Sequence, residues 1–199
     1  MYNRIANKLT SILILKGIIE ENKHDIYAYG FEILIAYLFY ILYFSIISII
    51  TRTFFTSLSF LVGFVVLRNF AGGYHAATYK MCHILFALNH LIYIFAQHYI
   101  PTYMYISVFI TTVLISVISI WLLAPVDHEN RPFSDSEFAR FRKRSRSYTF
   151  GIISVTVVII LIPKSYDLGF GYLFGTLSAT ISLIIAKIKK YFNNMKLSE

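Results

Sequence analysis

Residues 68–82 read RNFAGGYHAATYKMC and interrupt an otherwise hydrophobic chain. The stretch contains the only cysteine of the protein, Cys82, a histidine seven positions before it, His75, and the glycine pair Gly72-Gly73. Hydrophobic runs flank it on both sides. Exposed backbone polar groups are costly in hydrocarbon, so a glycine-broken polar stretch between such runs is expected inside protein or at the water boundary. This stretch is therefore the first candidate for chemistry.

The composition is that of an integral membrane protein. Hydrophobic residues make up 57% of the 199 residues and charged residues 14%, and the mean hydropathy is +0.65. Soluble globular domains carry about 25% charged residues. The length indicates one membrane domain over residues 1–199, with no separate soluble domain.

Hydrophobic runs predict an all-α fold with about six transmembrane helices. The runs cover residues 28–50, 54–67, 84–100, 103–123, 150–162 and 168–186, of which the second and fifth are short for a span. Residues 1–22 carry apolar side chains at helical spacing and predict an amphipathic helix lying in the membrane interface. An ordinary helix packed on the bundle is the alternative.

The basic residues predict the orientation of the protein in the cell membrane. The formal charge is +8, and Lys and Arg gather at 140–146, within a polar loop expected over 125–148, and at 187–190. Such clusters at the ends of spans are typical of cytoplasmic flanks facing anionic lipid. The pattern therefore argues against nucleic-acid binding. It places both termini, the 125–148 loop and residues 68–82 on the cytoplasmic side.

Cys82 is either a small buried apolar residue or a reactive thiol. A nucleophilic thiolate needs a base nearby, and His75 is the candidate. On one unbroken helix the two residues would lie roughly 10 Å apart along the axis, so the chain must fold back. Gly72-Gly73 supplies the flexible backbone. We expect a helix to begin near Thr78, with Cys82 in its second turn and the helix N-terminus stabilising the thiolate.

Other residues of the two polar stretches have candidate supporting roles. Arg68 either reaches to the interface or holds a substrate carboxylate or carbonyl. The N–H groups of Gly72 and Gly73 are oxyanion candidates. Asp127 or Glu32 could orient His75, as a carboxylate does in a triad. For Asp127, capping a helix or starting a turn is the alternative.

The remaining histidines and small residues are interpreted as packing elements. His83 is a poorer partner for Cys82, and His90 and His98 are expected to bond between helices or lie at the interface. No metal-ligand pattern is present, and no cofactor is expected. Gly171, Gly175 and Ala179 recur at four-residue spacing, which predicts close helix packing, within the chain or across a homodimer.

Two motifs give the chain a resemblance to a known family. The first is Arg68 followed by Gly-Gly-Tyr-His at 72–75 and the lone Cys82. The second is residues 124–132, APVDHENRP, with a basic run after it. Their order and the hydrophobic layout resemble the accessory gene regulator protein B (AgrB) family of membrane-embedded cysteine peptidases, which process quorum-sensing propeptides.

The resemblance implies that His75 and Cys82 are the catalytic pair, with Arg68 and Gly73 at motif positions. It implies a small membrane-associated propeptide as substrate, whose C-terminal part is cut off while the acyl group passes to Cys82. A Cys or Ser of the peptide then captures the acyl group and gives a cyclic thiolactone or lactone. The resemblance also implies a homodimer. The competing hypothesis is a non-enzymatic transporter or peptide-binding scaffold, with the short second and fifth runs and the glycine-broken stretch as discontinuous helices that line a path.

Overall fold

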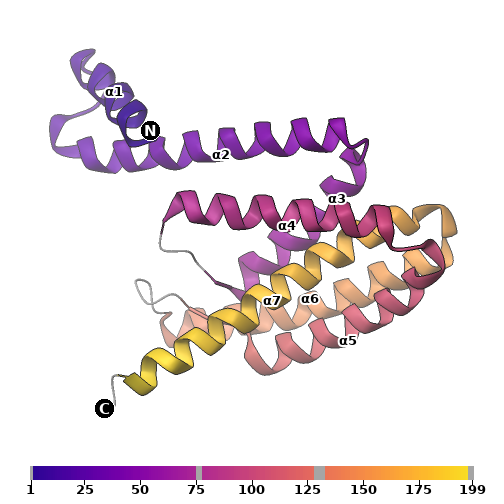
Figure 1. Cartoon of the computed structure of the whole chain (residues 1–199). Coiled ribbons are helices and arrows are strands. Elements are labelled where there is room, and N and C mark those ends of the chain that lie inside the picture. Colours follow the sequence, from indigo (N-terminus) through magenta and orange to yellow (C-terminus); the bar gives the residue numbers. More distant parts are fainter. Residues whose placement is uncertain (1, 75–77, 128–132, 197–199) are drawn as a thin grey trace. The chain divides into compact units, whose positions relative to one another are not determined.

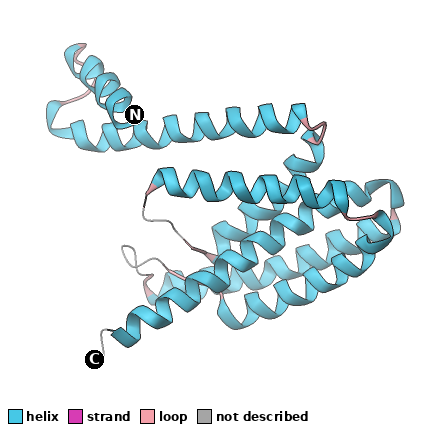
Figure 2. Cartoon of the chain, viewed as in Figure 1, coloured by secondary structure: helices cyan, strands magenta, loops and turns pink. Residues whose placement is uncertain are grey.

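The structure is a computed structural model that describes residues 2–74, 78–127 and 133–196. Within these residues no strand is present, and helices account for nearly all regular structure (Figure 2). The predicted all-α fold is confirmed. The α-helices are α1 (Tyr2–Leu15), α2 (His24–Ile50), α3 (Phe54–Ala71), α4 (Tyr79–Tyr99), α5 (Tyr105–Leu123), α6 (Asp135–Leu161) and α7 (Tyr166–Lys196), with short 3-10 helices at Glu21–Lys23, Thr102–Met104 and Pro163–Ser165.

The chain divides into two compact units, Met1–Arg52 and Thr53–Glu199. In the first unit α1 packs on α2. Ala6 and Thr10 of α1 are buried, whereas Ile5, Leu9 and Ile12 stay 38–40% exposed. Packing on another helix is the alternative that the sequence left open. An interfacial helix would turn this exposed apolar stripe to lipid. The location of α1 in the membrane interface stays a prediction.

The second unit is a bundle of five helices, α3 to α7, whose directions alternate (Figure 1). At one end the start of α3 meets the end of α4, where the Thr56 hydroxyl donates to Gln97 Oε1 over 2.9 Å. At the other end the amide of Val126, just after α5, donates to the Ala71 carbonyl over 3.0 Å. Helices α3, α5 and α7 therefore run one way, and α4 and α6 run the other.

Glycines let α3 and α7 pack backbone against backbone. A Cβ at Gly171 would collide with the Thr56 carbonyl oxygen, one at Gly175 with that of Phe60, and one at Gly63 with that of Tyr172. The predicted small-residue surface of α7 is thus confirmed as a packing surface, and its partner is α3 of the same chain. Helix α7 is the central helix, since 56% of its apolar span is buried against 22–28% for α3, α5 and α6.

Five helices of the described chain are long and apolar enough to cross a membrane, and α4 is not among them. The sequence predicts about six spans, and the third of these, residues 84–100, corresponds to α4. Helix α4 nevertheless runs antiparallel along α3, and its polar side chains Asn89, His90 and Gln97 bond to α3 or α7. His90 is fully buried and its Nε2 lies 3.1 Å from the Ser57 hydroxyl. The Ser178 hydroxyl donates to Asn89 Oδ1 over 3.0 Å. The role expected for His90, bonding between helices, is confirmed.

The polar loop expected over 125–148 is shorter than predicted, because residues 135–148 are the first half of the 27-residue helix α6. A capping box starts this helix: the Ser134 hydroxyl accepts from the Glu137 amide, and the Glu137 carboxylate accepts from the Ser134 amide. The ring of Phe133 stacks on Phe141, with centroids 4.9 Å apart. The fifth run is therefore not a short helix. Helix α3 likewise continues to Ala71, which gives it about 27 Å of length.

Replacing Gly175 by Ala should destabilise the protein by about 1–3 kcal/mol, because the new methyl group collides with the Phe60 backbone. Gly151→Ala is the matched control. It also replaces a glycine inside a helix, but its Cβ would meet only Tyr148 Cδ2 at 3.9 Å. The control should be neutral or gain up to about 1 kcal/mol of helix propensity. Thermal unfolding of the detergent-solubilised protein measures both, and equal midpoints for the two variants would contradict the close packing.

Candidate functional site

The two sequence motifs meet at one end of the five-helix bundle. The chain after α3 runs extended beside the chain after α5, with Gly72 and Val126 forming a parallel bridge. The Val126 amide donates to the Ala71 carbonyl over 3.0 Å. The sequence placed both motifs on one side of the membrane, and the structure brings their backbones into contact.

Gly72 is a glycine for two physical reasons. Its φ of +79° and ψ of −163° lie in a region that only glycine adopts without strain. A Cβ there would also collide with the Val126 carbonyl oxygen. The Gly72 amide donates to the Arg68 carbonyl over 3.1 Å and so caps α3. Gly72 therefore lets α3 end and the chain pass close to the second motif.

Arg68 and Ser182 hold the backbone just after the glycine pair. Arg68 Nη1 donates to the Ser182 hydroxyl over 2.7 Å, and Nη2 donates to the Tyr74 carbonyl. The Tyr74 amide donates to both the hydroxyl and the carbonyl of Ser182, each over 3.0 Å. A Cβ at Gly73 would lie 2.9 Å from Arg68 Nη1 and from Ser182 Oγ. The space for this network exists because residue 73 has no side chain.

The end of α7 makes a second connection to this region. Lys190 Nζ forms an ion pair with Asp127, whose side chain is 19% exposed. The ammonium of Lys189 lies 5.6 Å from the ring centroid of Tyr74. Burial alone would raise the pKa of Asp127. The hydrogen bond and charge of Lys190, with backbone hydrogen bonds at Asp127 and Phe133, lower that pKa below its ordinary value of 3.8.

Cys82 is an exposed free thiol near the start of α4. The helix begins at Tyr79 with Thr78 as its N-cap, where the Thr78 hydroxyl accepts from the Met81 amide over 3.2 Å. The helix start expected near Thr78 is thus confirmed. The Cys82 amide donates to the Thr78 carbonyl over 3.1 Å and closes the first turn, so Cys82 lies slightly earlier in the helix than predicted. The positive end of the helix dipole favours a negative charge at this position.

The other predicted site residues divide into three groups. His75 lies outside the described residues, directly after the anchored Tyr74. Arg68, Gly72, Gly73 and Asp127 all lie in the network just described, where Arg68 donates to the chain's own carbonyl and Asp127 pairs with Lys190. Their roles toward a substrate, an oxyanion or His75 stay predictions. Glu32 lies half-buried in α2, in the first unit.

Ser182, Lys189 and Lys190 were not predicted as site residues. Ser182 stands seven residues after Gly175, on a helix whose sequence gives no sign that its last turns contact the 71–74 segment. Its separation from its partners is 114 residues for Arg68 and 108 for Tyr74. The lysines were interpreted only as a basic tail. The prediction that α7 continues as a helix to Lys196 would have helped to identify Lys189 and Lys190. A continuous helix carries both lysines past the end of the apolar span.

The fold and the site define a class of protein, the polytopic α-helical membrane proteins. In this one a glycine-broken segment follows α3, and an exposed thiol lies near the start of α4. The comparison with family models is specific. The accessory gene regulator B (AgrB) model matches residues 2–187, and the chain belongs to this family. The resemblance read from the two motifs is confirmed. No curated protein and no solved structure matches the chain.

Removing the Ser182 hydroxyl should loosen the segment before His75. In Ser182→Ala, Arg68 and the Tyr74 amide lose an acceptor, and a hydrogen bond to a charged group contributes about 1.5–3 kcal/mol. Hydrogen exchange measured by mass spectrometry should show at least about tenfold faster exchange at Tyr74. Ser178→Ala removes a hydroxyl one turn earlier on α7, which bonds to Asn89 instead. Tyr74 protection that falls equally in both variants would argue against a specific anchor.

The ion pair between Asp127 and Lys190 should contribute to stability in a pH-dependent manner. The folded-state pKa of Asp127 is lowered, so its contribution is present above the unfolded value and is lost as pH falls through the folded pKa. The difference in stability between the wild type and Lys190→Gln should be about 1 kcal/mol or less near neutral pH, since Lys190 is 42% exposed. This difference in stability should begin to fall as pH drops toward 3.8 and should vanish once pH is below the folded-state pKa, which is lower still. Lys187→Gln is the control, and an equal pH dependence in that variant would contradict the assignment.

Proposed function

We propose that this protein is a membrane-embedded cysteine endopeptidase that removes the C-terminal part of a small quorum-sensing propeptide. The observation that carries the proposal is family membership over residues 2–187, together with one exposed thiol at the start of α4. No metal or cofactor takes part. Cys82 is the nucleophile, and His75, seven residues before it in the chain, is the base.

The chemistry needs two acyl transfers. His75 takes the Cys82 proton, and the thiolate attacks the carbonyl carbon of the scissile peptide bond. The C–N bond breaks, His75 protonates the leaving amine, and a thioester on Cys82 remains. His75, now neutral, then takes the proton of the internal Cys or Ser of the peptide, which attacks this thioester, closes a thiolactone or lactone ring, and releases the Cys82 thiolate. A thioester exchanged for a thiolactone changes little in energy, so ring closure depends on proximity.

The anchored segment supports this role through positioning. Arg68 and Ser182 fix both backbone polar groups of Tyr74, the residue that precedes His75 in the chain. A base held by a restrained backbone keeps its geometry toward the nucleophile better than one on a free loop. Asp127 has Lys190 as a partner, which gives it a structural role. The proposal also includes a third residue, either Asp127 or Glu32, that orients the His75 ring.

The basic residues support a cytoplasmic site. The last turns of α7, with Lys189 and Lys190, lie at the same end of the bundle as the two motifs. The first half of α6 starts at that end, where Arg146 Nη2 donates to the Trp121 carbonyl over 3.3 Å. Basic residues at span ends favour the cytoplasmic side, where a thiol stays reduced. We place both termini there and expect the protein to act as a homodimer in the cell membrane.

A groove beside the first motif offers room for part of the propeptide. It has a volume of about 860 Å³ and is lined by Phe70 at the end of α3 and by the basic face of α6, including Arg140, Lys143 and Arg144. Such a groove suits an acidic peptide segment. The transporter alternative loses one of its two reasons, the short second and fifth runs, because α3 and α6 are continuous helices of 18 and 27 residues.

The test is co-expression with a cognate propeptide, found as a short reading frame beside the gene that encodes an amphipathic start, a central Cys and an acidic tail. Cys82→Ala and His75→Ala should each abolish cleavage, a loss of at least about a thousandfold, while protein levels persist. His83→Ala, next to the nucleophile, is the matched control and should retain activity.

A propeptide whose internal nucleophile is replaced by Ala should stall the reaction. The expected product is a hydroxylamine-sensitive adduct on Cys82, with the C-terminal fragment already released. Rapid release of linear acid instead would identify an ordinary hydrolase. Cleavage that persists in Cys82→Ala would remove Cys82 as the nucleophile, and a transporter would be indifferent to the substitution.

A further inference from the structure

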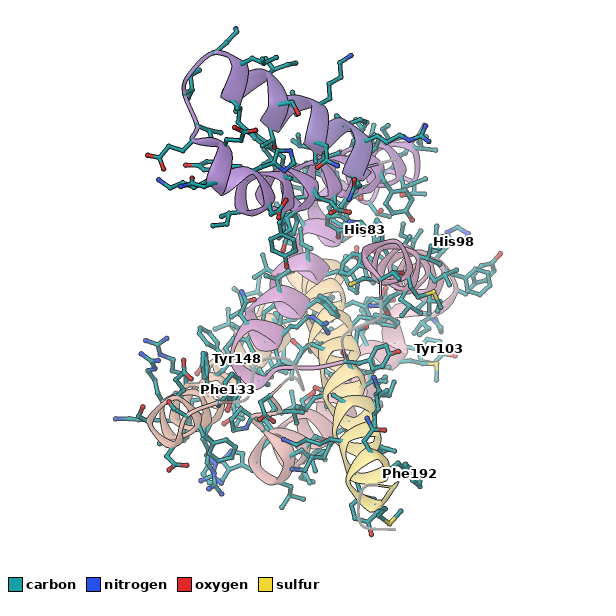
Figure 3. The ribbon with its side chains drawn as sticks, turned by 90° about the vertical axis from the view of Figure 1, so that its left-hand side faces the viewer. His83, His98, Tyr103, Phe133, Tyr148 and Phe192 are labelled. Atoms are coloured by element: carbon teal, nitrogen blue, oxygen red, sulfur yellow. The ribbon has the colours of Figure 1, made fainter. Side chains whose placement is uncertain are left out.

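A second groove, basic and aromatic, lies between the end of α5 and the first half of α6. Its volume is about 440 Å³, and its lining includes Trp121, Phe138, Phe150, Arg142, Lys143 and Arg146. All charged side chains of the lining are positive. The groove is distinct from the one beside Phe70, although both share the ridge of α6 that carries Lys143. Tyr148, labelled in Figure 3, lines the groove beside Phe70 and not this one.

Arg146 is held in place while part of its bonding capacity is unused. Its guanidinium carbon lies 4.8 Å from the Trp121 ring centroid, and Nη2 donates to the Trp121 carbonyl over 3.3 Å. Its Nε–H is buried and has no hydrogen-bond acceptor within the described residues. A guanidinium fixed on an indole ring, with donors left over, is suited to an oxyanion such as a phosphate.

The walls of the groove are apolar and face outward. Trp121 is 44% exposed, Phe138 40% and Phe150 65%. Trp121 lies two residues before the end of α5 at Leu123. Tryptophans at the ends of spans sit at the level of the lipid headgroups. The groove therefore combines phosphate-binding cations with exposed rings at the depth where headgroups join acyl chains.

We propose that this groove binds an anionic phospholipid. The phosphate pairs with Arg142, Lys143 and Arg146, and the first part of the acyl chains lies over Trp121 and Phe150. An acidic peptide would satisfy the cations but leave these exposed rings uncovered, whereas a phospholipid satisfies both. The inference does not depend on the proposed peptidase activity.

Trp121 is the only tryptophan of the protein, so its fluorescence reports on this groove alone. The full chain is reconstituted into phosphatidylcholine bilayers containing either brominated phosphatidylglycerol or, as the neutral probe, brominated phosphatidylcholine. Half-maximal quenching is expected at a roughly fivefold lower fraction of the anionic probe, or lower, since each basic residue near the surface favours anionic lipid by about this factor. Equal quenching by the two probes in the wild type would overturn the proposal.

Matched variants separate a site from general charge attraction. Arg146→Gln should remove the preference for phosphatidylglycerol. Arg144→Gln, which removes one charge from the same helix but does not line this groove, should retain it. Arg142→Gln is the second test variant, because the Arg142 side chain is exposed and its loss should not disturb α5. A preference that falls equally in Arg144→Gln and in both groove variants would show diffuse attraction and overturn the site.

A final arm tests the peptide as occupant. Soluble poly-glutamate is added to the protein in purely phosphatidylcholine bilayers. Unchanged Trp121 emission supports the lipid assignment. A change in emission that Arg146→Gln abolishes would assign the groove to acidic peptides instead, provided that the change is the same when the measurement is repeated in bilayers containing phosphatidylglycerol.

Discussion

The backbone contact between α3 and α7 is the constraint on which the five-helix unit depends. Glycines at 63, 171 and 175 let the two helices approach until a carbonyl of one lies where a Cβ of the other would be. In a membrane there is little hydrophobic gain from bringing helices together, so close packing of this kind supplies much of the attraction. The same approach brings Arg68 near the end of α3 within hydrogen-bond distance of Ser182 on α7.

Helix α4 completes the unit by a different means. Asn89, His90 and Gln97 would be costly facing lipid, and each bonds instead to a side chain of α3 or α7. The His90 ring also lies beside two aromatic rings, with centroids 5.8 Å from Phe60 and 6.2 Å from Tyr93. These bonds fix the position of α4 along the bundle. They therefore also fix the place of Cys82, which stands at its first turn.

The sequence predicted the class of fold, the helix start at Thr78 and the family, because these depend on local signals: hydrophobic length, a capping residue and the two motifs. It underestimated α6, since a run of arginines looks like a loop when the capping box at Ser134 and Glu137 is overlooked. It could not identify Ser182 or Lys190 as partners of the motifs. Those contacts depend on which face of α7 meets α3, a fact that emerges only when the glycine contacts set the rotation of the two helices.

The anchor at Ser182 also determines when this region of the protein can take shape during synthesis. Arg68 and Tyr74 bond to a residue more than 100 positions later in the chain, on α7, which leaves the ribosome after α3 to α6. Until α7 has entered the membrane, the segment that leads to His75 has neither its hydroxyl anchor nor the lysine that pairs with Asp127. The contacts that hold the two motifs are thus completed only once α7 has been synthesised and inserted, and a chain without α7 lacks them.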